Sequence, residues 1–146
     1  MKLLRILTVA LIAGAVLVPA AMSDQSASRA TLTAKTSRFG KVLFDGRGFV
    51  LYAFTRDLRR SACYGACARA WPPYFAPKGS LSVASGAKRS LLSTVKRKNG
   101  WRQVTYAGRP LYYYVGDTRA GQILCQDVDE YGGTWLIVRP SGKLVR

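Results

Sequence analysis

The 146-residue sequence contains no histidine, and this absence excludes several kinds of site at once. Without an imidazole the chain cannot by itself form a Ser-His-Asp or Cys-His hydrolase site, a histidine-ligated zinc site or a histidine-ligated haem. Its three cysteines are too few for a zinc ion held by four thiolates. We therefore expect a non-enzymatic protein with no catalytic residues, no metal site and no cofactor.

The sequence also has no hydrophobic run long enough to cross a bilayer. The longest, Ile6–Val18, has 13 residues, fewer than the roughly 20 that a spanning helix needs. It follows Lys2 and Arg5 and precedes small residues at 19–23, which is the order of a secretory signal peptide. We predict a cleaved signal peptide at residues 1–22 and no transmembrane span after cleavage. The expected location is secreted or periplasmic, at the cell envelope.

Acidic residues are scarce: Asp and Glu number 7 against 23 Lys and Arg, so the formal net charge is +16. The basic residues are spread along the chain rather than gathered in one run, which is typical of a solvated surface. Such a charge nevertheless attracts polyanions. For an exported protein we expect anionic envelope polymers or lipid headgroups as partners, and nucleic acid only non-specifically.

Cys63, Cys67 and Cys125 are an odd set, so at most one disulfide can form within the chain. Cys63 and Cys67 would share a face of a helix at a Cα separation that a disulfide tolerates. A bond from Cys125 to either of them would instead close a far longer loop. Further hypotheses are a thiol redox site, a soft-metal site for an ion such as Cu(I), and a covalent dimer through the spare cysteine.

The sequence matches itself at an offset of 60 residues, which indicates an internal repeat. Both copies contain the pattern G-x-x-L-Y-x-[FY]-x-x-D. The paired positions are Gly48 with Gly108, Leu51 with Leu111, Tyr52 with Tyr112, Phe54 with Tyr114, and Asp57 with Asp117. Trp71 and Trp135 follow the two aspartates, although a gap is needed to align them.

Each copy contains two β-prone runs around a turn, at residues 42–54 and 103–115, and this pattern predicts antiparallel hairpins. A last strand is expected at 134–138, and a helix over Ser61–Trp71. We predict a mainly β fold in which two pseudo-symmetric antiparallel repeats share one core, because either repeat alone would bury too little apolar surface. One short helix is expected at the C-x3-C segment.

The predicted organisation has a flexible linker before a single domain. The boundaries are 23–37 for the linker and 38–146 for the β domain, with repeat one at about 38–75, a loop-rich connector at 76–100 and repeat two at about 101–140.

These residues resemble a known family, the bacterial secreted tandem repeats of unknown function that carry a Y-x4-D motif, written in full as Y-x-[FWY]-x-x-D. Tyr52–Asp57 and Tyr112–Asp117 both match the motif, and Cys63–Pro73 resembles the stretch C-x-G-x-C-A-x-x-W-P-P. The resemblance implies a small bacterial envelope or secreted protein with two repeats, and it implies no activity. Members of the family are often lipoproteins, but no cysteine lies near the cleavage region here, so we expect no lipid anchor.

The repeated side chains are the first candidate site: Tyr52, Phe54, Asp57, Trp71, Tyr112, Tyr114, Asp117 and Trp135. They have two interpretations. The tyrosines pack within the sheet while each aspartate caps the turn or helix that follows it, or the set binds a ligand or supplies catalytic acids.

Three functions follow from these observations. The first is a non-enzymatic module that binds anionic envelope material through a basic and aromatic surface. The alternatives are a thiol redox or soft-metal-handling protein that uses its three cysteines, and an enzyme whose acids are Asp57 and Asp117.

Overall fold

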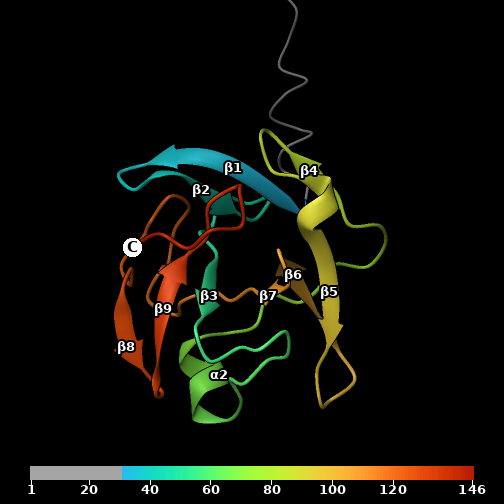
Figure 1. The fold of residues 1–146 in the computed structure, drawn as a ribbon, viewed down its shortest axis with the longest axis vertical. Helices are drawn as coiled ribbons and strands as arrows, with labels where there is room; N and C mark the ends of the chain where they lie inside the picture. The colour runs from blue at the N-terminus through green and yellow to red at the C-terminus, as the bar shows by residue number, and fades with distance from the viewer. Residues whose placement is uncertain (1–30) are drawn as a thin grey trace, which may run out of the picture.

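The computed structural model describes residues 31–146 (Figure 1). The predicted signal peptide lies outside this range. The elements in chain order are β1 (Leu32–Ser37), β2 (Gly40–Phe44), β3 (Tyr52–Phe54), α2 (Ala66–Ala70), β4 (Val83–Ala84), a 3-10 helix (Arg89–Leu91), β5 (Leu92–Lys96), β6 (Arg102–Tyr106), β7 (Arg109–Pro110), β8 (Val128–Glu130) and β9 (Gly133–Ile137). Within the described range, no helix is long and apolar enough to cross a membrane.

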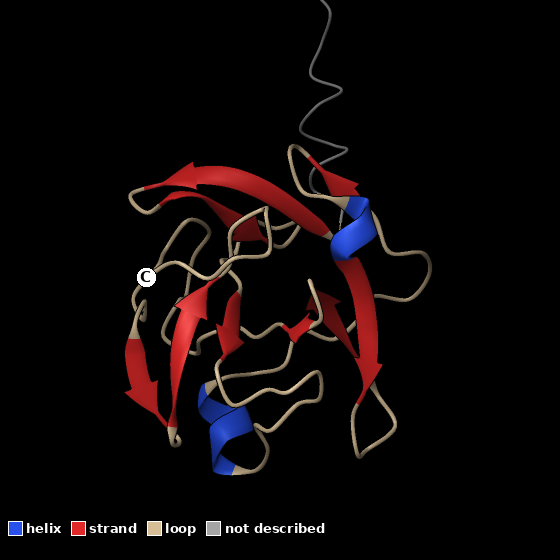
Figure 2. Cartoon of the chain, in the orientation of Figure 1, coloured by secondary structure: helices blue, strands red, loops and turns tan. Residues whose placement is uncertain are grey.

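The strands form three small sheets, with the orders β2-β1-β4, β5-β6-β7 and β3-β9-β8. All pairs are antiparallel except β1 with β4, which is parallel. Strands predominate over helix, and α2 lies at the disulfide segment (Figure 2). The predicted mainly β fold with one short helix is therefore confirmed.

Both repeats begin with a hairpin that starts about ten residues earlier in the chain than the predicted hairpin. The β1–β2 hairpin pairs Thr33 with Phe44, and the β5–β6 hairpin pairs Leu92 with Tyr106. Strand β1 occupies residues 32–37, inside the predicted flexible linker, so that prediction was wrong for these residues. Its side chains are mostly small or polar, but β1 is paired on both sides, with β2 and β4, and this pairing buries Leu32 completely.

Strand β5 likewise corrects the prediction of a loop-rich connector over residues 76–100. The predicted helix was also too long, because α2 covers only Ala66–Ala70. Gly65 before it has a φ of +57°, in the left-handed region, which interrupts the helical path. The loop before Gly65 is instead held by a hydrogen bond, in which the Ala62 N–H donates to Asp57 Oδ1 at 2.7 Å.

The two repeats meet at Tyr52 and Tyr112. The N–H of each residue donates to the carbonyl oxygen of the other, both at 2.9 Å, so these two equivalent residues form an antiparallel bridge. Strand β3 runs through the middle of the molecule (Figure 1). Tyr52 faces one buried cluster while Leu51 and Ala53 face another, so β3 is buried on both sides. This explains the unbroken apolar run at 50–54.

Aromatic rings from both repeats form one continuous stack. Phe54 lies 4.2 Å from Trp135, Trp135 lies 4.0 Å from Trp71, and Trp71 lies 4.8 Å from Tyr114, measured between ring centroids. Each tryptophan therefore stacks on an aromatic residue of the opposite repeat. Each also meets its own repeat's tyrosine edge-on, Trp71 with Tyr52 at 5.2 Å and Trp135 with Tyr112 at 5.1 Å. The repeats thus share one core.

We predict that Trp71→Ala lowers the free energy of unfolding by about 3–5 kcal/mol, the usual cost of deleting a buried large aromatic side chain. It removes the ring between Trp135 and Tyr114. Trp101→Ala is the matched control, because Trp101 is 62% exposed, and it should change stability by less than about 1 kcal/mol. Urea unfolding followed by circular dichroism measures both, and similar losses in the two variants would contradict a shared aromatic core.

Candidate functional site

Each repeated aspartate interacts with the tyrosine of the other repeat. The Tyr52 hydroxyl donates to Asp117 Oδ2 at 2.7 Å. In the equivalent contact, the Tyr112 hydroxyl interacts with the Asp57 carboxyl, although neither that hydroxyl nor Asp57 Oδ2 makes a hydrogen bond of normal geometry among the described residues. Of the two crossed pairs, Tyr52 with Asp117 therefore makes the hydrogen bond of normal geometry.

The second carboxylate oxygen of each aspartate organises the loop that follows it. Asp57 Oδ1 accepts the Ala62 N–H at 2.7 Å, and Asp117 Oδ1 accepts the Leu124 N–H at 3.0 Å. The Asp57 and Asp117 N–H groups make matching turns, each donating to a carbonyl three residues earlier at 3.1 Å. These contacts support the capping interpretation, in which the aspartates hold turns rather than helices.

An arginine from each hairpin strengthens the same crossed arrangement. Arg38, after β1, donates to the Ile123 carbonyl oxygen at 2.8 Å, and Arg97, after β5, donates to the Cys63 carbonyl oxygen at 2.7 Å. In both cases the hairpin of one repeat therefore holds the loop that follows the aspartate of the other repeat.

Asp57 lies beside a buried polar network that the sequence analysis did not identify. Arg97 is 5% exposed and donates to Gln103 Oε1 at 2.6 Å. The Ser61 hydroxyl also donates to that oxygen, and Gln103 Nε2 donates to the Leu111 carbonyl oxygen at 2.7 Å. A glutamine within a β-prone run gives no sign that it will be buried, because period-two alternation normally places polar residues outside.

Burial shifts the pKa values of these groups. It raises the pKa of Asp57 to about 6, against the opposing effects of the Ala62 N–H, the Tyr112 hydroxyl and the Arg97 charge. Burial also raises the pKa of Asp117, while its bond from Tyr52 lowers it. The pKa of each crossed tyrosine rises as well, mainly because of burial. Asp57 and Asp117 share no hydrogen-bond partner among the described residues, so the contacts do not join them into one acid pair.

The structure contains a disulfide between Cys63 and Cys67, with a Cα separation of 5.3 Å. Cys63 lies in the loop before α2 and not on the helix, so the two do not share a helical face as predicted. Cys125 is free and half-buried. It occupies the place that corresponds to Cys63, since Leu124 and Ala62 donate to equivalent aspartates.

Burial raises the pKa of the Cys125 thiol, which disfavours the thiolate needed for exchange or metal binding. Within residues 31–146 no group of three or more His, Cys, Asp or Glu side chains is placed to hold a metal ion.

Among the described residues, the acidic side chains are either buried or gathered near β8, so most of the remaining surface is cationic. Asp45, Asp57 and Asp117 are buried. The others lie in or beside β8, at Asp127, Asp129 and Glu130. In the part of the chain that the structure describes, the only ion pair joins Arg47 to Asp45 at 3.0 Å. Exposed basic side chains elsewhere in this part can therefore meet an external anion.

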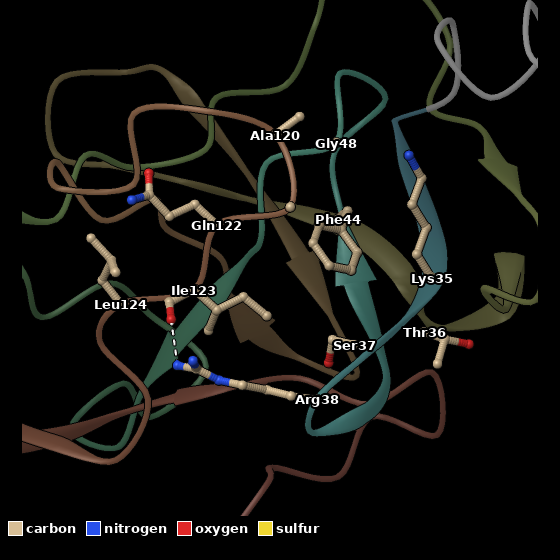
Figure 3. A pocket seen from close by; sticks show the side chains of 11 residues that line it. Lys35, Thr36, Ser37, Arg38, Phe44, Gly48, Ala120, Gln122, Ile123 and Leu124 are labelled. Atoms are coloured by element: carbon tan, nitrogen blue, oxygen red, sulfur yellow. Dashed lines mark hydrogen bonds between the residues drawn. The ribbon is translucent and has the colours of Figure 1, made fainter.

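An open pocket of about 630 Å³ lies between the β1–β2 hairpin and the loop at 120–124 (Figure 3). Phe44 and Ile123 lie at its centre, with Lys35 on one side and Arg38 below. None of the described residues that line it is acidic. The hydrogen bond to Ile123 fixes Arg38, whereas Lys35 makes no ion pair with a described residue. The pocket therefore offers two cationic groups over an apolar base.

A glycine allows the pocket walls to approach each other. Gly48 has a φ of +92°, and a Cβ at this position would lie 3.1 Å from the Ala120 Cβ and 3.5 Å from Lys35 Nζ. Any side chain here would therefore be strained and would crowd Lys35.

A smaller hollow of about 460 Å³ occupies the corresponding place in the other repeat, beside Gly108. There Val95 stands 60 residues after Lys35. Arg59 also lines this hollow, so it carries one cationic residue where the first pocket carries two, Lys35 and Arg38.

A comparison with protein families identifies one match. The family model described as a secreted repeat of unknown function matches residues 33–74 and 93–139. These segments begin in β1 and β5, in agreement with the hairpins that open the two repeats. No curated protein and no solved structure matches the chain.

We predict that Asp57→Asn makes stability less dependent on pH. The folded pKa of Asp57, about 6, exceeds its ordinary value of 3.8. Between these values the unfolded chain binds fewer protons, so wild-type stability falls as pH rises. Between about pH 4 and pH 7, the free energy of unfolding of the variant should therefore rise by on the order of 2 kcal/mol relative to that of the wild type. Urea unfolding across this range measures the difference, with the exposed Asp129→Asn as control. A difference that does not change with pH would contradict the raised pKa.

We also predict that alkylation without reductant labels Cys125 alone, because Cys63 and Cys67 are bonded to each other. Labelling should be slower in the folded protein than in denaturant, since burial disfavours the Cys125 thiolate. Intact mass and peptide mapping identify the labelled cysteine. Label on Cys63 or Cys67 before reduction would show that the pairing is different.

Proposed function

The chain belongs to the family of secreted repeats of unknown function, and from this premise we propose that it is a non-enzymatic module that binds anionic envelope polymers. The observation that carries the proposal is the pocket with Lys35 and Arg38, in which none of the described lining residues is acidic. Phosphate or carboxylate groups of an envelope polymer would pair with these two cations. Cationic residues over the rest of the surface would extend the attraction along the polymer.

The repeated tyrosines and aspartates are buried, which favours the exposed cationic residues rather than the motif residues as the ligand-binding groups. Tyr52 and Tyr112 are completely buried, and Asp57 and Asp117 are at most 8% exposed. A polymer cannot reach buried groups without opening the fold. The motif residues therefore maintain the core and position the loops, while the exposed cations make contact with the ligand.

The thiol redox and metal alternative has less support. The Cys63–Cys67 disulfide occupies two of the three thiols, and burial raises the pKa of the third. A catalytic pair of aspartates is also disfavoured, since Asp57 and Asp117 hold separate loops.

We predict that the protein binds polyglycerol phosphate in a salt-sensitive manner, with affinity falling at least tenfold between about 0.05 and 0.5 M salt because added ions screen exposed charges. Lys35→Glu should weaken binding by about tenfold, since it replaces attraction with repulsion inside the pocket. Lys143→Glu makes the same charge change at an exposed lysine that does not line the pocket, and it should have a smaller effect. Calorimetric titration measures these affinities.

Two results would count against the proposal. Binding that is unaffected by high salt would show that charge is not its basis. Equal losses from Lys35→Glu and Lys143→Glu would show that net charge alone matters and that the pocket is not the site.

A further inference from the structure

The turn between β5 and β6 exposes the only tryptophan of the described residues that is not buried. Trp101 is 62% exposed, whereas Trp71 and Trp135 are completely buried. A large aromatic side chain that remains in water at a turn contributes little to the core. Trp101 does not stand alone, because its ring packs on the ring of Phe75 and the two form a small aromatic surface at this turn.

The turn holds Trp101 in a defined position. Trp101 packs against Phe75 with 5.1 Å between ring centroids. The Arg97 N–H donates to the Trp101 carbonyl oxygen at 2.8 Å, and the Gly100 N–H donates to the Arg97 carbonyl oxygen at 2.9 Å. Buried Arg97 also anchors the turn through its bond to Cys63. The indole is therefore presented on an ordered turn.

Cationic residues flank Trp101 in the sequence. Lys96, Lys98 and Arg102 are all exposed. The Lys98 ammonium also lies 5.1 Å from the centre of the Tyr64 ring. The segment from β5 to β6 contains no acidic residue, and the exposed acids lie at β8, on the other side of the molecule in Figure 1.

The equivalent turn of the first repeat lacks this feature. At the offset of 60 residues that aligns the repeats, Gly40 corresponds to Gly100, and both have a positive φ. The exposed Lys41 therefore occupies the place of Trp101. The fold therefore forms the same hairpin without an exposed indole. This difference points to a role for Trp101 outside the fold.

We propose that the β5–β6 turn docks on the anionic lipid surface of a bilayer. Trp101 enters the headgroup region, where amphipathic indoles are favoured, and Lys96, Lys98 and Arg102 pair with lipid phosphates. A projecting turn suits a broad surface, and Trp101 lines neither of the two hollows described above. This site and its partner are separate from those of the proposed polymer binding.

Tryptophan fluorescence tests the proposal with the whole exported protein. Vesicles that contain anionic phosphatidylglycerol should shift the emission to shorter wavelength, and brominated lipid should quench it, because Trp71 and Trp135 are buried and Trp101 is exposed. Neutral phosphatidylcholine vesicles should do neither. Trp101→Ala should weaken sedimentation with anionic vesicles by about tenfold, as should the double change Lys96→Glu and Lys98→Glu.

Leu58→Ala is the matched control, because Leu58 is 85% exposed and lies outside the turn. It should bind vesicles like the wild type. Equal binding by the Trp101→Ala variant would overturn the proposal, as would equal binding to neutral and anionic vesicles. Binding to polyglycerol phosphate that depends on Trp101, without vesicle binding, would overturn it too and assign the turn to polymer instead.

The same measurements separate the two proposals. Lys35→Glu should weaken polymer binding by about tenfold and leave vesicle binding unchanged. If polymer binding fails while vesicle binding depends on Trp101, the docking proposal stands alone.

Discussion

The structure depends on contacts that cross between the two repeats. Tyr52 bonds to Asp117, Tyr112 faces Asp57, and the two tyrosines pair through their main chains. The loop after each aspartate is held both by that aspartate and by an arginine of the other repeat. This constraint explains why tyrosine and aspartate recur at a fixed spacing in both halves, and it predicts that the domain unfolds as a single cooperative unit.

Because the repeated residues pack in the core, we expect the residues that contact a ligand at positions where the repeats differ. Lys35 corresponds to Val95, and Trp101 corresponds to Lys41. The first difference gives one pocket a second cationic residue, and the second gives one turn an exposed indole. On the two proposals above, a duplicated framework with different surfaces presents two contacts from one small domain, one for a polymer and one for a lipid surface.

The sequence predicted the repeat and the mainly β fold, and it singled out the repeated tyrosines and aspartates without deciding between a structural and a ligand-binding role. It could not predict that the tyrosine–aspartate contacts cross, because an internal match shows which residues are equivalent and not which ones touch. Strand β1 was missed because its pairing with β2 and β4, rather than its own mostly small and polar side chains, holds it in place. Buried Gln103 and Arg97 were also missed, since their partners come from distant loops.

Native-state hydrogen exchange at Tyr52 and Tyr112 tests the shared core most directly. Their amide hydrogens make the reciprocal bonds between the repeats. If the crossed contacts join the repeats into one unit, both amides should exchange only through global unfolding, with equal free energies that match the value from urea unfolding. Exchange of one repeat through a separate opening of lower free energy would contradict the account.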